Sequence, residues 1–264
     1  MDAAALDYTP LSPAELDEYR RLGHVVRRRV FSAGEMAALR RESERLLTER
    51  SDLIDPCNLR CRYMPHVETG EKVFEVFDPV NDISPVCRDF TTDARLVALV
   101  ESIYGEPACL FKEKLIFKPP GAMGYNLHQD IPRYWEGFPR TFLTVLVPID
   151  AATRENGCTE VFSGYHHAFL SPPGRPDLYL LPDDAVDSRR RVKLVLEPGD
   201  VAIFHGLTPH RSEPNRSRAF RRTLYVSYNA LSEGGDQRAA HYREFQERMR
   251  SHQASQGNDK TYFR

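Results

Sequence analysis

His128-Gln129-Asp130, read together with His210 far along the chain, is the strongest indication of how this protein folds. In an extended strand, residues i and i+2 point to the same side, so His128 and Asp130 can face one metal ion from one short stretch. His210 has to arrive from a distant strand. A barrel or curled sandwich brings such strands together around an interior large enough for a metal and small ligands.

The same residues indicate a chemistry. Two imidazoles and one carboxylate can occupy one face of an octahedral Fe(II) and leave three positions open, as non-haem iron oxygenases require. An H-x-D tripeptide is a weak signal by itself, because nine histidines and many aspartates make one by chance. Arg221 follows His210, and its planar fork suits a carboxylate. Arg221 also belongs to a basic segment, 211–222, and by composition alone such a segment is usually solvated surface.

The segments around these residues predict strands. Residues 110–118 form a strand-like run closed by Pro119-Pro120-Gly121, and Pro198-Gly199 precedes the apolar run that leads to His210. Strand signals dominate from residue 108 to about residue 230. His205 and His166 lie near this part of the chain, where we expect a strand-end and a structural role rather than metal binding.

In an ordered series of motifs, the sequence resembles the phytanoyl-CoA dioxygenase family of Fe(II)/2-oxoglutarate oxygenases. The resemblance covers nearly the whole chain and rests on segments 11–16, 23–26, 118–120, 128–130, 156–158, 162–166, 198–200, 210–217, 221–222 and 225–228. It is specific for the superfamily and not for a substrate. It implies a mainly β fold with flanking helices (α+β), a double-stranded β-helix of the jelly-roll or cupin-like type. It also implies one domain over 1–264, with a helical part at 1–107, a jelly-roll core at 108–230 and a C-terminal helix and tail at 231–264.

The resemblance further implies the site. His128, Asp130 and His210 would be the catalytic Fe(II) ligands, with 2-oxoglutarate and O2 as cosubstrates. Arg221 would clasp the C5 carboxylate of 2-oxoglutarate with help from Ser212, and Thr144 would line the cosubstrate pocket. Arg222 should then face the other side of its strand.

Substrate binding is predicted around the loop 131–139, which contains the only Trp of the chain. Aromatic and cationic side chains together suit a compact polar substrate with an anionic group. Lys112, Lys114 and Lys118 alternate along the preceding strand, facing either the interior or the wet side of an edge strand. The candidate substrate-binding residues are Lys114, Asn126, Arg133, Tyr134 and Trp135.

The function expected from these features is hydroxylation of a small polar metabolite, with aminophosphonate-like and amino-acid-like compounds as first candidates. Bacterial relatives that hydroxylate small aminophosphonates look similar around residues 112–115 and 128–130. Two alternatives stay open: a tailoring oxygenase of secondary metabolism that hydroxylates, desaturates, cyclises or epimerises, and a non-catalytic cupin-like binding protein. Halogenation is disfavoured, because halogenases of this superfamily replace the carboxylate ligand and Asp130 is present.

Composition agrees with a cytoplasmic enzyme acting on small molecules. A chain of 264 residues can bury a large core, and its net charge of -2 argues against a nucleic-acid partner. No apolar stretch approaches the roughly 20 residues of a membrane helix. The N-terminus lacks the basic region of a secretory signal, and five cysteines, an odd number, argue against a disulfide framework. We expect a monomer or a homodimer.

Helices are predicted at 13–22, 32–47, 96–104 and from 236 to about 250. Ser32 and Glu35 form a capping box, and Gly105 is a natural C-cap. A short strand is expected at 24–31. Residues 53–82 are mixed and loop-rich, and we expect them at the entrance of the active site.

Overall fold

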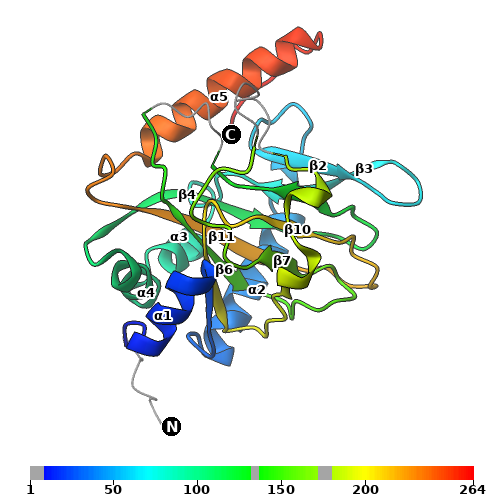
Figure 1. Ribbon diagram of the computed structural model, residues 1–264. Helices are drawn as coiled ribbons and strands as arrows, with labels where there is room; N and C mark the ends of the chain where they lie inside the picture. Colours follow the sequence, from blue (N-terminus) through cyan, green and yellow to red (C-terminus); the bar gives the residue numbers. More distant parts are fainter. Residues whose placement is uncertain (1–8, 132–136, 172–179) are drawn as a thin grey trace.

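Two antiparallel sheets form the body of the protein in the computed structural model, which describes residues 9–131, 137–171 and 180–264 (Figure 1). The larger sheet has the order β1 (His24–Arg27), β9 (Val201–His205), β6 (Leu143–Pro148), β11 (Thr223–Ala230), β4 (Ala108–Ile116), β3 (Lys72–Phe77) and β2 (Cys61–Pro65). The smaller sheet has the order β5 (Tyr125–His128), β10 (His210–Ser212), β7 (Thr159–Phe162) and β8 (Arg191–Lys193). The crossing connections between the sheets are those of a jelly roll, so the predicted fold class is confirmed.

Strand β6 shows how the layers are built. Val145 and Val147 belong to the apolar core shared with the N-terminal helices, whereas Leu146 packs into a second cluster with Val161 of β7 and Phe204 of β9. Alternate side chains of one strand therefore point to opposite faces of the larger sheet. One face is covered by helices, and the other faces the smaller sheet across the interior where ligands can bind.

The helices on the outer face are α1 (Pro13–Leu22), α2 (Ala33–Thr48), α3 (Pro85–Thr91) and α4 (Ala94–Tyr104). Helices α1, α2 and α4 begin and end close to the predicted positions. The predicted capping box is confirmed, because Ser32 Oγ accepts from Glu35 N and the Glu35 carboxylate accepts from Ser32 N. Gly105 caps α4 in the left-handed region at φ 71°. Helix α3 was not predicted from the sequence, since its seven residues are too few to show a helical period.

The predicted strand at 24–31 is too long by four residues. It ends at Arg27, because Arg29 adopts a positive φ of 57° and turns the chain. The N–H groups of Val30 and Phe31 then donate to the Gly199 carbonyl instead of continuing the ladder. The loop-rich segment 53–82 contains β2 and β3, which extend the sheet beside the cavity described below.

The C-terminal helix α5 (Arg238–Ser255) lies across one end of the sandwich (Figure 1). The Tyr242 hydroxyl ties it to β4, since it accepts from Glu113 N and donates to Glu113 O, both at 2.9 Å. The helix extends past the predicted end near residue 250. No helix in the described ranges is long and apolar enough to cross a bilayer.

Candidate metal centre and adjoining cavity

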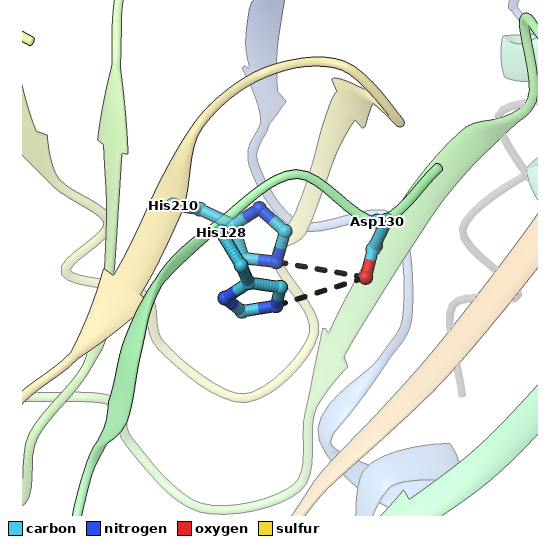
Figure 2. Close-up of side chains that lie close together, drawn as sticks. All are labelled: His128, Asp130 and His210. Atoms are coloured by element: carbon cyan, nitrogen blue, oxygen red, sulfur yellow. Dashed lines mark ion pairs between the residues drawn. The ribbon is translucent and has the colours of Figure 1, made fainter. Parts of the chain in front are cut away.

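Strands β5 and β10 bring three potential metal ligands together. His210 pairs directly with His128 across the smaller sheet, and Asp130 follows just after β5. One ligand atom from each residue lies within 4.8 Å of the other two. Both histidine Nε2 atoms lie 3.8 Å from Asp130 Oδ1, and Figure 2 shows the two rings turned toward this carboxylate. The predicted convergence of His128, Asp130 and His210 is therefore present.

Backbone carbonyls orient both imidazoles. His128 Nδ1 lies 2.7 Å from the Asn126 carbonyl, and His210 Nδ1 lies 3.0 Å from the Thr208 carbonyl. A carbonyl can only accept, so Nδ1 carries the proton in both rings and Nε2 keeps its lone pair for a metal. Such outer hydrogen bonds are typical of histidine ligands.

Two residues hold the H-x-D segment in place through contacts that the sequence did not reveal. The buried Gln129 amide donates to the Leu207 and Ala168 carbonyls and accepts from Leu170 N. Thr144 Oγ1 donates to Asp130 Oδ2 at 2.9 Å. Thr144 was expected in the cosubstrate pocket. It lines the cavity, but its hydroxyl contacts the carboxylate of a potential ligand.

The protonation states suit a cation. Burial, together with the neighbouring His210, lowers the pKa of His128 to about 3, and burial also lowers the pKa of His210. Burial raises the pKa of Asp130, but the nearby histidines and lysines outweigh this effect and leave it below its usual range. Two neutral imidazoles and one carboxylate at neutral pH are the forms that bind a divalent metal.

Arg221 lies in the interior rather than on the surface. Its side chain is 2% exposed, and its Nη1 donates to the Gly157 carbonyl at 2.9 Å. Lys118 Nζ shares that carbonyl and also donates to Ser212 Oγ at 2.9 Å. Arg221 Nε is buried without a hydrogen-bond partner among the described residues. Leaving a buried guanidinium donor unpaired is costly, so this atom suits an acceptor supplied by a ligand.

Gly157 makes this arrangement possible. It adopts a positive φ of 68°, and a Cβ at this position would lie 2.0 Å from the Glu213 carbonyl oxygen. Only glycine allows this close approach. The Gly157 carbonyl is thereby left facing Arg221 and Lys118. Arg222 points the other way, as predicted, with its Nε donating to Asp150 Oδ2 at 2.7 Å.

A buried carboxylate completes the polar group. Glu75 is fully buried and accepts from the Tyr125 hydroxyl at 2.7 Å, while its Oε1 has no partner among the described residues. Burial raises the pKa of Glu75 against the opposing influence of Tyr125, Lys118 and Arg221. Glu75 was not among the residues predicted from the sequence, because no motif in the neighbouring sequence distinguishes a functional glutamate from any other glutamate in an apolar strand.

A cavity of about 310 Å³ opens beside two of the three potential ligands, His128 and Asp130. His128, Asp130 and Thr144 line one side, and Lys112 and Lys114 of β4 line another. Lys112 and Lys114 therefore face the interior rather than the wet side of an edge strand, and Lys118 is buried. A smaller hollow adjoins the cavity at Lys114, Tyr125, His128, Asp130 and Tyr225, and reaches Ser212 and His210.

The other predicted substrate residues are placed differently. Asn126 is exposed and lines a separate hollow with Met123 and Leu180, although its carbonyl orients His128. Arg133, Tyr134 and Trp135 lie outside the described residues. His205 ends β9, as predicted, and its Nδ1 accepts from Leu207 N.

Buried histidines outside the metal centre predict sensitivity to acid. Burial lowers the pKa of His24, His166 and His205 to about 4 and that of His241 to about 3. The unfolded chain protonates its histidines near pH 6.5, whereas the folded chain does not, so stability is complete above this pH and declines below it. Each such group contributes about 1.4 kcal/mol per pH unit in this window.

We therefore expect the free energy of unfolding to fall by several kcal/mol between pH 7 and pH 5, measured by urea denaturation with metal removed. The variant His24→Gln should make this dependence less steep by the share of one group, whereas His252→Gln, at an exposed position of α5, should leave it unchanged. A free energy that stays constant over this range would show that these histidines bind protons equally in both states.

Comparison with known proteins agrees with this geometry. The family model of the phytanoyl-CoA dioxygenases matches residues 19–223. A methylphosphonate hydroxylase from Gimesia maris is 38% identical over 59% of this chain and 58% of its own length. A 2-aminoethylphosphonate dioxygenase from an uncultured bacterium is 34% identical over 63% of each chain. The aligned part of the chain thus spans about three fifths of these two relatives.

A solved structure supports the fold. EctD from S. alaskensis, determined with 2-oxoglutarate and 5-hydroxyectoine, superposes with a TM-score of 0.70 at 23% identity. The match covers 89% of this chain and 82% of that protein. At this identity the likeness concerns the jelly-roll architecture.

Proposed function

The chain belongs to the phytanoyl-CoA dioxygenase family, and on that premise we propose that it is an Fe(II)- and 2-oxoglutarate-dependent dioxygenase that hydroxylates a small polar metabolite. The observation that carries the proposal is the convergence of His128, Asp130 and His210 beside a cavity of about 310 Å³. A non-catalytic binding protein has no need for a set of three ligands that leaves coordination positions of a metal open beside a cavity of this size.

The residues present fit both groups. Two neutral imidazoles and one carboxylate are the donor set of the facial triad, and His128, Asp130 and His210 would hold Fe(II). Arg221, whose buried Nε lacks a partner among the described residues, would hold the C5 carboxylate of 2-oxoglutarate. Ser212 is nearby, because Lys118 donates both to Ser212 Oγ and to the Gly157 carbonyl that Arg221 contacts. When bound, these groups supply the oxidising chemistry, in which 2-oxoglutarate is decarboxylated to succinate and CO2 while O2 provides the oxygen added to substrate.

The chain's own residues position and shield this chemistry. The Asn126 and Thr208 carbonyls fix the tautomers of the histidines, and Gln129 holds the segment 128–130 in place through the Leu207 carbonyl. Lys118 holds the Gly157 carbonyl and Ser212 in place beside Arg221. Helix α5 and strand β4 line the cavity, so a small substrate bound there contacts protein on more than one side.

The similar proteins suggest where to look for a substrate. Both relatives act, by name, on phosphonates, which are compact anions, and the wall of the cavity is rich in cations. We therefore take aminophosphonate-like and amino-acid-like acids as first candidates. The bacterial relatives also support a cytoplasmic location, and a monomer or homodimer is sufficient for a site built from one chain.

The test is direct. Purified protein loaded anaerobically with Fe(II) is titrated with 2-oxoglutarate by calorimetry, and then supplied with O2 and a panel of phosphonates and amino acids while succinate release is followed. We expect uptake of 2-oxoglutarate that disappears after removal of metal with EDTA, and succinate release stimulated by a subset of the panel. Absence of 2-oxoglutarate binding to the Fe(II) form would overturn the proposal.

The Thr144 hydroxyl gives a more specific prediction. Thr144→Val keeps the shape of the side chain but removes the hydrogen bond that orients Asp130. We expect the affinity for Fe(II) to fall by about 10- to 100-fold, as is typical when an outer partner of a ligand is lost. Thr144→Ser should retain most of the affinity, measured by competition with a metal chelator. Equal affinities in the Val and Ser variants would show that this hydroxyl does not support the metal.

A further inference from the structure

Basic side chains gather on the cavity wall near the metal centre. Three structural elements contribute them: β2 provides Arg62, β4 provides Lys112 and Lys114, and α5 provides Arg248. The two lysines are two residues apart on one strand, so both project from the same face. Segments far apart in the sequence thus converge on one side of the cavity.

The acids of this wall are already matched. Asp78 lies 3.2 Å from Arg62, and Glu113 lies 2.6 Å from Arg238, which is not itself a cavity residue. Asp130 belongs to the metal centre. Within the described residues Lys114 forms no ion pair, and its Nζ lies 5.4 Å from the centre of the Tyr225 ring. Among the described residues that line the cavity, basic side chains therefore outnumber acidic ones.

Burial affects the charge of Lys112. Lys112 Nζ lies 4.5 Å from the centre of the Phe142 ring, and burial lowers the pKa of Lys112 to about 8 despite the opposing influence of Asp130. Cations removed from water are stabilised when an anion enters their site, and a tetrahedral dianion can accept from several donors at once. A carboxylate offers one charge and two oxygens, which matches this wall less well.

We propose that Lys112, Lys114 and Arg248 form the subsite for a dianionic phosphonate group of the substrate. The inference rests on the proposed function and specifies the substrate class of the same site. Lys114 lines both the cavity and the hollow at the metal ligands, so the bound group lies close to the metal centre. A carbon attached directly to phosphorus is then within reach of oxidation. Phe245 and Met249 of α5 supply an apolar part of the wall, against which a short alkyl chain packs.

The experiment compares substitutions at two residues that line the larger cavity but not the smaller hollow. Lys112→Gln and Arg248→Gln are assayed with Fe(II), 2-oxoglutarate and either methylphosphonate or 2-aminoethylphosphonate. Losing a charged hydrogen-bond donor should raise KM for the phosphonate about tenfold or more in each variant. The affinity for 2-oxoglutarate, measured by anaerobic calorimetry, should stay close to that of the wild type. Arg250→Gln, at an exposed position on the same helix outside the cavity, is the matched control and should leave KM unchanged.

A second arm tests the charge of the ligand. The compound 3-aminopropanoate replaces the phosphonate of 2-aminoethylphosphonate by a carboxylate, and we expect it to stimulate much less succinate release. Comparable turnover of the two compounds, or a phosphonate KM that the Lys112 and Arg248 variants leave unchanged, would overturn the subsite. So would a wild-type protein that binds 2-oxoglutarate but neither binds nor oxidises any phosphonate.

Failure of the proposed function is distinct from these results, because wild-type protein would then not bind 2-oxoglutarate at all. If Lys112→Gln does not fold, Arg248→Gln on the partly exposed helix still decides the outcome.

Discussion

Replacing Asp130 by alanine is expected to reduce substrate-dependent succinate release to the background of metal-free protein. Asp130 supplies the carboxylate of the candidate metal centre, and its Oδ1 lies 3.8 Å from both histidine Nε2 atoms. The substitution removes a ligand and the negative charge that offsets the metal, so both Fe(II) affinity and turnover should be lost. Two neutral imidazoles alone would hold the ion weakly.

The measurement combines Fe(II) binding, by competition with a chelator, with succinate release. Asp89→Ala, at an exposed position of α3, is the control and should behave as wild type. Asp130→Asn keeps the shape and the contact with Thr144 while removing the charge, so it separates a loss of charge from a local collapse. Fe(II)-stimulated turnover retained in Asp130→Ala would place the metal elsewhere.

The candidate metal centre could be predicted only partly from local information. His128 and Asp130 are separated by one residue, whereas His210 comes from β10, a distant strand that the jelly-roll topology pairs with β5, and its place followed from the family resemblance. The structure refines the geometric reason: Asp130 lies beyond the end of β5, and its N–H donates to the Gly206 carbonyl at 2.8 Å. The turn before His210 thus holds the backbone of Asp130 in place. The spacing of the residues in the sequence does not reveal this contact.

The supporting contacts could not be predicted, because they join residues distant in the sequence. Thr144 reaches Asp130 from β6, and Glu75 reaches Tyr125 from β3. Neither residue has a local pattern that differs from an ordinary strand position. The contribution of α5 was hidden in a similar way, because nothing in its polar and charged sequence marks Phe245 and Arg248, which line the cavity.

Replacing Arg221 by alanine should weaken 2-oxoglutarate binding by about a hundredfold, or about 3 kcal/mol, while Fe(II) binding is retained. The guanidinium is almost fully buried, and its Nε is free of any partner in the described part of the chain, so a carboxylate bound there would be held by a desolvated charge. The Gly157 carbonyl keeps its contact with Lys118 in the variant, which preserves one support of the local backbone.

Calorimetric titration of the anaerobic Fe(II) protein measures this loss, and thermal unfolding establishes that each variant is folded. Arg218→Ala removes an exposed charge from the same basic segment and should leave the affinity unchanged, which separates a specific contact from general attraction. Arg221→Lys keeps the charge but loses the planar fork, and we expect an intermediate affinity because a lysine cannot bind a carboxylate in two-point fashion. If Arg221→Ala binds 2-oxoglutarate as tightly as wild type, the carboxylate must instead be held by another cation, and Lys118, whose ammonium reaches Ser212, is the first to test.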